Sequence, residues 1–168
     1  MEQGRKWNDD LIRVDTREQN PLFEAAPRIT MRTGDYTVVG MEAVLAVERK
    51  SVADLFGSLG GVKGANRRRF LRAFRRLSLL PWGAVLVEGP PEGFYKAPRF
   101  GRITPAHALG TMLRWSGVYR VPGWFADNRA VARAEAEEAT SKEMVARFRS
   151  ELATLEAKAA GLPEAPSL

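Results

Sequence analysis

The chain contains no cysteine and a single histidine, His107, in its 168 residues. Disulfide bonds and thiolate metal centres are therefore excluded, and a cluster of histidine ligands cannot be assembled. No segment approaches the roughly 18 consecutive apolar residues that a membrane-spanning helix requires, and the polar N-terminal segment does not fit a secretory signal. We expect an intracellular protein, cytoplasmic or nucleoid-associated and not secreted, that has no membrane partner and holds any metal through oxygen atoms.

Acidic residues are also too few to balance the basic ones, and the imbalance is local. Lys and Arg number 26 against 20 Asp and Glu, yet residues 127–168 hold eight acids and six bases. Between residues 63 and 76 there are seven bases and no acid. Phe70 and Phe74 recur there at helical spacing, and Asn66 stands where it can cap the helix. The seven bases are Lys63, Arg67, Arg68, Arg69, Arg72, Arg75 and Arg76.

A solvated helix face usually mixes charges of both signs, whereas a face of arginines alone repels itself unless phosphates neutralise it. We therefore predict that this helix contacts a nucleic-acid backbone, with an ordinary solvated face as the alternative. A second basic segment, residues 89–102, mixes Phe and Tyr with Lys96, Arg99 and Arg102. That combination can stack bases and neutralise phosphates. The alternative is a long loop whose aromatic side chains pack on the core.

The candidate catalytic acids lie at the end of one predicted strand and at the start of another. Residues 44–48 are apolar and β-branched up to Glu48, which predicts a buried strand. Because side chains alternate across a strand, Glu48 and Lys50 would emerge on one face and Arg49 on the other. Gly34 and Asp35 open another short extended run, residues 36–39, so a hairpin would bring Asp35 beside Glu48.

Two carboxylates and a lysine in this arrangement fit a metal-dependent phosphodiester-cleaving site. Mg²⁺ and Mn²⁺ prefer oxygen ligands, and Mg²⁺ usually takes only one or two carboxylates together with water and substrate phosphates. An ammonium such as that of Lys50 can orient the attacking water or stabilise the transition state. The alternative is that Glu48 and Lys50 are an ordinary polar strand end and Asp35 a common turn residue.

The motif ValGluArgLys at 47–50, followed after three residues by Asp54, resembles the nuclease domain of the XPF-type structure-specific endonucleases. GlyAspTyr at 34–36 and AspThrArgGlu at 15–18 extend the likeness, which runs from about residue 11 to about residue 148. That domain is a branch of the restriction-endonuclease-like PD-(D/E)XK fold. The resemblance implies a Mg²⁺-dependent endodeoxyribonuclease, with Mn²⁺ as a substitute, that cuts branched, flap or fork DNA in repair or recombination.

The resemblance also implies which residues form the site. The active-site positions are Asp15, Arg17, Glu18, Asp35, Glu48, Arg49, Lys50 and Asp54, and the metal ligands are Asp15, Glu18, Asp35 and Glu48. Some of these residues have simpler explanations: Asp54 follows Ser51 at the spacing of a capping box, and Asp15 and Glu18 stand where a strand runs into a polar loop. Arg17 would either contact the scissile phosphate or pair with an acid at the surface.

The alternation of segments predicts one α/β domain with a mixed central sheet flanked by helices, as in the restriction-endonuclease-like fold. We place the domain at 1–156 and a flexible C-terminal tail at 157–168. Strands are expected at 11–15, 28–32, 36–39, 44–48, 83–88 and 118–121. Helices are expected at 51–59, 66–79, 104–115 and 127–155, with Pro105 in the first turn of the third and Asp127 capping the last.

The relatives that the motif indicates carry helix-hairpin-helix modules after the nuclease domain, and this sequence shows none, so we expect a free-standing domain. The resemblance further implies a homodimer, for which the apolar helix containing Leu109, Met112, Leu113 and Trp115, together with the C-terminal helix, would provide a face. Some members of the family are catalytically inactive DNA-binding partners, and the arginine-rich helix would serve such a protein equally well. Arginines and acids alone do not distinguish DNA from RNA.

Overall fold

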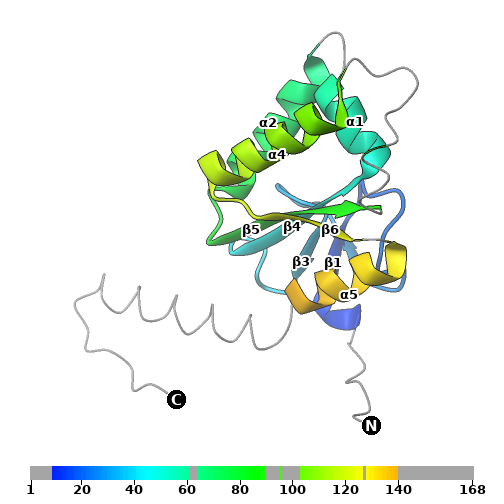
Figure 1. Ribbon diagram of the computed structural model, residues 1–168. Coiled ribbons are helices and arrows are strands. Elements are labelled where there is room, and N and C mark those ends of the chain that lie inside the picture. Colours follow the sequence, from blue (N-terminus) through cyan, green and yellow to red (C-terminus); the bar gives the residue numbers. More distant parts are fainter. Residues whose placement is uncertain (1–8, 61–63, 90–94, 96–102, 127, 140–168) are drawn as a thin grey trace, which may run out of the picture.

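A computed structural model describes residues 9–60, 64–89, 95, 103–126 and 128–139 (Figure 1). The predicted tail at 157–168 and the end of the predicted last helix lie outside these residues. The elements are η1 (Asp9–Leu11), β1 (Ile12–Asp15), β2 (Arg28–Ile29), β3 (Tyr36–Val38), β4 (Leu45–Ser51), α1 (Val52–Gly60), α2 (Ala65–Leu77), β5 (Trp82–Glu88), α4 (Pro105–Tyr119), β6 (Gly123–Ala126) and α5 (Arg129–Ala139).

The strands form one mixed sheet of six, in the order β2-β1-β3-β4-β5-β6. β1, β3 and β4 are antiparallel neighbours, whereas β4, β5 and β6 run parallel and are joined by helical connections. Figure 1 shows α1, α2 and α4 on one side of the sheet and α5 on the other. This is the predicted α/β architecture of a mixed sheet flanked by helices.

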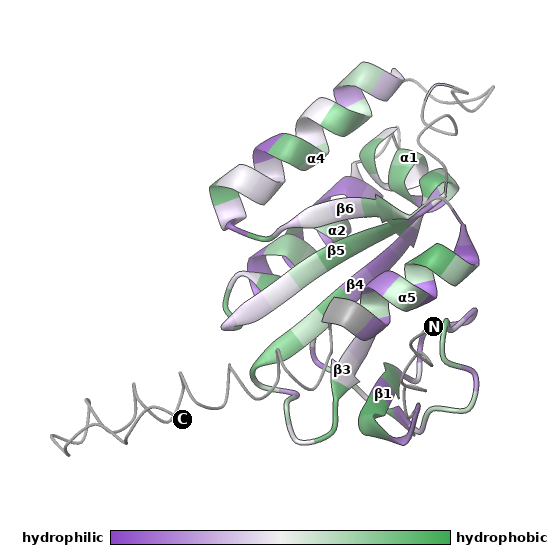
Figure 2. Cartoon of the chain, turned by 60° about the horizontal axis from the view of Figure 1, so that its bottom comes forward, coloured by the Kyte–Doolittle hydropathy of each residue, from purple (hydrophilic) through white to green (hydrophobic). Residues whose placement is uncertain are grey.

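The two faces of the central strands supply two hydrophobic clusters. Val47 and Leu86 pack in the cluster that includes α5, while Ala46 and Val85 pack in the cluster beneath α1, α2 and α4. Because successive side chains point to opposite faces, this pattern determines which face of the sheet each polar residue at the end of β4 occupies. Figure 2 shows β4 changing from apolar to hydrophilic along its length. Glu48 and Lys50 therefore continue the Ala46 face, and Arg49 continues the Val47 face.

One predicted strand is wrong. Residues 118–121, with Val118 and Tyr119 favouring an extended chain, belong instead to the end of α4 and the turn after it. Helical spacing decides the outcome, because Met112, Trp115 and Tyr119 pack against one cluster. Arg120 then closes the helix in the left-handed conformation, at φ 54°, and the strand forms later, as β6.

Three local predictions also change. The strand expected at 28–32 ends at Ile29, because the N–H of Met31 donates to Asp15 Oδ2, 2.7 Å away, instead of to a neighbouring strand. Helix α2 is not capped by Asn66, since its N-cap is Gly64 at φ 62° with no side-chain bond. Asp127 lies outside the described residues, and the first N–H groups of α5 donate to Asn128 Oδ1 at 3.0 and 3.1 Å.

None of the described helices combines the length and apolar character needed to cross a membrane.

The C-terminal end of α2 rests directly on the backbone of β5. A Cβ atom placed on Gly83 would lie 2.5 Å from the carbonyl oxygen of Leu77 and 2.9 Å from its carbonyl carbon. Both atoms belong to the main chain, so a side-chain rotation cannot relieve the overlap. Only glycine allows this approach of helix and strand.

We expect Gly83→Ala to lower the free energy of unfolding by about 1–3 kcal/mol, because the overlap forces the backbone to shift. Gly117→Ala provides the control, since a Cβ atom there would meet no described atom within 4 Å. That substitution should raise the stability of α4 by roughly 0.5–1 kcal/mol. Urea unfolding followed by circular dichroism measures both. Equal stability of the Gly83 variant and the unsubstituted chain would mean that α2 and β5 are not in this contact.

Candidate active site

A cavity of about 650 Å³ opens between the polar end of β4, the helices α1 and α2, and the loop before β3. The loop supplies residues 32–35, β4 supplies Glu48 and Lys50, and the two helices supply the opposite walls. The charged residues that line it are Arg17, Arg32, Asp35, Glu48, Lys50, Asp54, Arg69 and Arg76. The cavity thus combines three carboxylates with five cations, and it contains five of the eight predicted active-site residues.

Asp35 is placed by the β3–β4 hairpin that the sequence predicts. Its N–H donates to Val47 O at 2.8 Å, and its Oδ2 accepts a 2.7 Å hydrogen bond from the N–H of Arg49. Gly34 makes this close approach possible, with φ 74° and a position where a Cβ atom would lie 2.9 Å from Ala46 Cβ. The hairpin therefore fixes the Asp35 carboxylate beside the outgoing end of β4.

Glu48 and Lys50 share a face of β4, as predicted, and Lys50 Nζ lies 3.8 Å from Glu48 Oε1. Only 16% of the Glu48 side chain is exposed. Burial raises the pKa of Glu48, and the nearby charges of Lys50, Arg76 and Arg17 offset only part of that rise. Lys50 Nζ also lies 5.1 Å from the ring centroid of Phe70 on α2, a cation–π contact that helps to orient the ammonium.

Asp35 is the most strongly perturbed of these acids. Burial, followed by the negative charge of Glu48, raises its pKa well above the ordinary value, despite the hydrogen bond from the Arg49 backbone. Two carboxylates that disfavour ionisation in one cavity provide a site at which a cation relieves their repulsion. Oxygen ligands of this kind fit Mg²⁺ or Mn²⁺.

The number of available ligands is small. Within the described ranges, no group of three or more acidic or histidine side chains is arranged to hold a metal ion. A pair of carboxylates is nevertheless the usual protein contribution to a Mg²⁺ site that also binds substrate phosphates. Asp35 and Glu48 meet that requirement.

Asp15 does not line the cavity, although the resemblance places it among the metal ligands. It is 1% exposed, and its oxygens accept four hydrogen bonds of 2.7–3.0 Å, three from Arg17 and one from the N–H of Met31. Burial acts to raise the pKa of Asp15, but these hydrogen bonds outweigh it and lower the pKa. Asp15 thus orients Arg17, whose side chain is 69% exposed and lines the cavity.

Glu18 and Arg49 likewise do not line the cavity, although the charge of Glu18 acts to raise the pKa of both Asp35 and Glu48. Arg49 Nη1 is 3.4 Å from Glu18 Oε1, and Arg49 Nε donates to Glu88 Oε2 at 2.5 Å. Arg129 of α5 stands 3.9 Å from the same Glu88 carboxylate. This ion-pair network belongs to the α5 side of the sheet, where Arg49 was predicted to point. Glu88 had no motif to mark it, and its only signal is its place at the end of β5.

Asp54 satisfies both interpretations of its position. Its N–H donates to Ser51 Oγ at 3.0 Å, and the Ser51 hydroxyl donates to Asp54 Oδ2 at 2.8 Å. This is close to the expected capping box at the start of α1. Asp54 also lines the cavity, so capping and a place in the site are compatible.

The predicted basic helix is α2, and its six arginines are exposed. Only Arg69 and Arg76 line the cavity. Lys63, Lys96, Arg99 and Arg102 lie outside the described residues. Sequence reasoning missed Arg32, an isolated base two residues before Gly34, and Asn66, which lines the cavity instead of capping α2.

The ERCC4 domain model matches residues 14–133, a range that contains every residue lining this cavity. The chain belongs to the ERCC4 domain family. Its fold resembles that of an XPF from Aeropyrum pernix in complex with DNA, with a TM-score of 0.60 and 22% identity over 77% of this chain and 62% of that one. A second structure of XPF from Aeropyrum pernix matches with a TM-score of 0.54 and 20% identity, over 85% and 72% of the two chains. No curated protein matches the chain in sequence.

The family match and the shared fold confirm the XPF-type nuclease domain that the motifs indicate. At these identities the two structures establish the fold alone. The chain spans less than two thirds of the length of the first XPF chain, so what that protein does beyond the shared domain does not pass to this one.

We expect Asp35→Asn to raise the melting temperature of the metal-free protein at pH 8. Because the folded-state pKa of Asp35 exceeds its unfolded-state value, the ionised carboxylate destabilises the fold above that raised pKa, and the penalty disappears as the pH falls through it. A gain of roughly 2–4 °C corresponds to about 1 kcal/mol in a domain of this size. Calorimetry in EDTA from pH 8 to pH 5 should show the advantage of the variant shrinking.

The control for this measurement is Glu24→Gln, which removes an exposed carboxylate that does not line the cavity. Its melting temperature should follow that of the unsubstituted chain at every pH, since surface substitutions usually change stability little. A lower melting temperature for Asp35→Asn at pH 8 would mark Asp35 as a stabilising structural residue.

The same exchange at Asp15 should have the opposite effect. Asp15→Asn replaces one accepting oxygen with an amide NH₂, which would face N–H donors of Arg17 or Met31. A buried donor without an acceptor costs about 1–3 kcal/mol, so urea unfolding at neutral pH should show a loss of that size. An unchanged free energy of unfolding would mean that the bonds to Asp15 do not stabilise the fold.

Proposed function

We propose that the chain is a divalent-metal-dependent endonuclease that hydrolyses phosphodiester bonds of branched, flap or fork DNA. The observation that carries the proposal is the pair Asp35 and Glu48, two carboxylates with raised pKa values in one cavity with Lys50. Burial raises the pKa of both acids, and the charge of Glu48 raises that of Asp35 further, which a structural role does not explain. A bound cation would favour the ionised acids.

Asp35 and Glu48 are the side chains that would hold Mg²⁺ or Mn²⁺. A bound ion of this kind neutralises charge on the phosphate and lowers the pKa of water. Lys50 lies next to Glu48 and can donate to the attacking water or to a phosphate oxygen. Arg17 projects into the cavity from its anchor on Asp15 and is suited to bind the scissile phosphate through its planar guanidinium.

The remaining residues of the motif have supporting roles in this proposal. Asp15 acts through Arg17, because its own oxygens already accept four hydrogen bonds. Arg49 and Glu18 connect the loop after β1 to the ends of β4 and β5 on the far side of the sheet. Asp54 lies in the first turn of α1 and adds a third carboxylate to the cavity wall. In this proposal Asp35 and Glu48 hold the ion, and Asp15 and Glu18, which the resemblance also implies as ligands, act through Arg17 and Arg49.

An inactive DNA-binding partner would require the arginines but not the acids. In such a protein, the repulsion between Asp35 and Glu48 would destabilise the fold with no compensating ligand. The half-buried carboxylate pair therefore favours the enzyme. The choice of DNA as substrate rests on the family and on the similar Aeropyrum pernix XPF, whose structure is a complex with DNA. A cleavage panel of single-stranded, duplex, flap, fork and four-way DNA, with RNA beside it, tests the substrate.

Three further features of the proposal come from the resemblance to XPF-type nucleases. The domain is assigned to residues 1–156, and the protein acts in the cytoplasm or nucleoid during repair or recombination. It forms a homodimer through α4, where Leu113 and Val118 are 60% and 65% exposed. Met112 and Trp115, which the sequence places on this face, instead pack in the core beneath α4. A molar mass measured by light scattering tests the dimer, and a monomer at micromolar concentration would contradict it.

We expect Asp35→Asn and Glu48→Gln each to reduce Mg²⁺-dependent nicking by at least about 100-fold, as the loss of a group that stabilises the transition state does. Binding of the same DNA in EDTA should be unchanged or stronger, since each substitution removes a negative charge from the cavity. Nicking of a labelled fork measures the first effect and fluorescence anisotropy the second. Glu24→Gln, which alters an exposed acid outside the cavity, should cut like the unsubstituted chain. Normal cutting by either active-site variant would refute the proposed ligands.

A further inference from the structure

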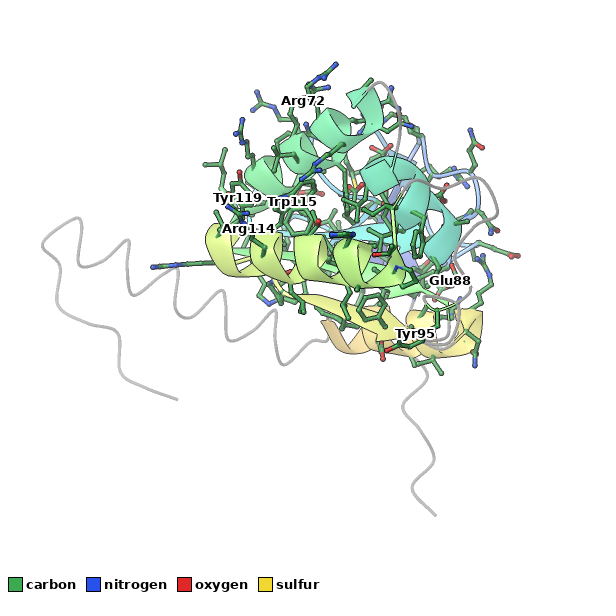
Figure 3. All side chains as sticks on the ribbon, turned by 45° about the horizontal axis from the view of Figure 1, so that its top comes forward. Arg72, Glu88, Tyr95, Arg114, Trp115 and Tyr119 are labelled. Carbon is green, nitrogen blue, oxygen red and sulfur yellow. The ribbon has the colours of Figure 1, made fainter. Side chains whose placement is uncertain are left out.

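The arginines of α2 do not form one uniform surface. Arg67 lies 5.6 Å from the ring centroid of Trp115, and Arg75 Nε is 3.4 Å from the hydroxyl of Tyr119, so these two arginines face α4. Figure 3 shows Trp115 and Tyr119 on the α4 helix and Arg72 at the outer side of α2, pointing away from the domain. The remaining four arginines, Arg68, Arg69, Arg72 and Arg76, lie on other faces of the helix.

Arg69 and Arg76 line the cavity, while Arg68 and Arg72 do not. Arg69 and Arg76 are seven residues apart, which is two helical turns, so they project from the same face of α2. Phe70 and Ala73, between them, contribute apolar surface to the same wall. The helix therefore presents two guanidinium groups to the cavity and two to open solvent.

None of the three carboxylates of the cavity is paired with these two guanidinium groups. Glu48 lies beside Lys50, Asp35 accepts from the N–H of Arg49, and Asp54 accepts from the Ser51 hydroxyl. Arg76 is close enough to Glu48 to lower its pKa, yet neither Arg69 nor Arg76 has a side-chain hydrogen bond or ion pair within the described part of the chain. Two unpaired cations on one wall repel each other unless an anion enters between them.

Arg17 and Arg32 also line the cavity, and the charges of Arg17 and Arg76 both act on Glu48. Two helical turns cover about 10 Å along α2. That length exceeds the roughly 3.4 Å rise along the duplex axis between successive phosphates of one strand, so Arg69 and Arg76 can each bind a different phosphate. A strand that crosses the cavity would therefore place one phosphate at the acids and others on the α2 wall.

We propose that Arg69 and Arg76 form a phosphate-binding subsite that grips the strand being cut on one side of the scissile phosphate. The subsite deepens the proposed nuclease function and rests on it. Arg68 and Arg72 are outside the subsite and attract nucleic acid only through their charge. Arg67 and Arg75 pack against α4 and help to fix the helix that carries the subsite.

The test compares two double variants with the same change in charge, on the same helix and with the same residue types. Arg69→Gln with Arg76→Gln removes the subsite, and Arg68→Gln with Arg72→Gln is the matched control. The probe is a fluorescein-labelled single-stranded hexathymidylate, and its dissociation constant is measured by anisotropy in EDTA at several NaCl concentrations. Circular dichroism confirms that both variants keep their helices, as expected for exposed positions and for glutamine, a good helix former.

We expect the subsite variant to bind the probe at least about tenfold more weakly, which corresponds to roughly 1.4 kcal/mol. Its salt slope should fall by about 1.4, because each phosphate contact on a single strand contributes about 0.7. The control should lose at most about threefold in affinity, as expected from a small change in long-range attraction. Equal losses in both variants would overturn the subsite in favour of a diffuse basic surface, as would normal binding by the subsite variant or no binding of the probe by the unsubstituted chain.

The result is separable from that of the proposed function, because the binding measurement involves neither metal nor cleavage. A chain that does not cut DNA with Mg²⁺ but shows the expected difference between the variants retains the subsite and loses the nuclease proposal. A chain that cuts DNA while both variants bind the probe equally retains the nuclease proposal and loses the subsite.

Discussion

The site depends on one hydrogen bond across the β3–β4 hairpin, from the N–H of Arg49 to the Asp35 carboxylate. This bond and the one from Asp35 N–H to Val47 O hold the acid at the point where β4 turns from apolar to charged. Without them, Asp35 would be an ordinary loop carboxylate with access to water. With them, it stands beside Glu48 in a half-buried position, although desolvation and the repulsion between the two carboxylates both oppose their ionisation there.

Because side chains alternate along β4, the residues that face the cavity lie on the opposite side of the sheet from the residue that forms ion pairs with the scaffold. Glu48 and Lys50 point into the cavity, while Arg49, between them in sequence, points through to the α5 side and binds Glu18 and Glu88. The three charges of the motif thus act on opposite sides of one sheet. A short run of charged residues at the end of a buried strand can therefore serve the reacting phosphate and the scaffold at the same time.

Much of this arrangement is predictable from the sequence, and the failures have identifiable physical causes. The hairpin, the shared face of Glu48 and Lys50 and the basic helix follow from strand alternation and helical spacing, which are local properties. The strand expected at 118–121 was wrong because packing of Trp115 and Tyr119 outweighs the extended preference of those residues. The detailed surroundings of Asp15 were also beyond local reasoning, since one of its donors is Met31, sixteen residues away. Arg32 was missed because no pattern joins it to the acids before the loop folds.

The contact between Gly83 and the carbonyl of Leu77 has a consequence for how the domain meets a ligand. Because the C-terminal end of α2 lies against the main chain of β5, the closest approach of this end of the helix to the sheet is set by backbone atoms. Arg76 stands one residue before this contact, so the end of the cavity wall that carries it is held by the main chain. A flexible polyanion that enters the cavity meets a wall anchored at that end.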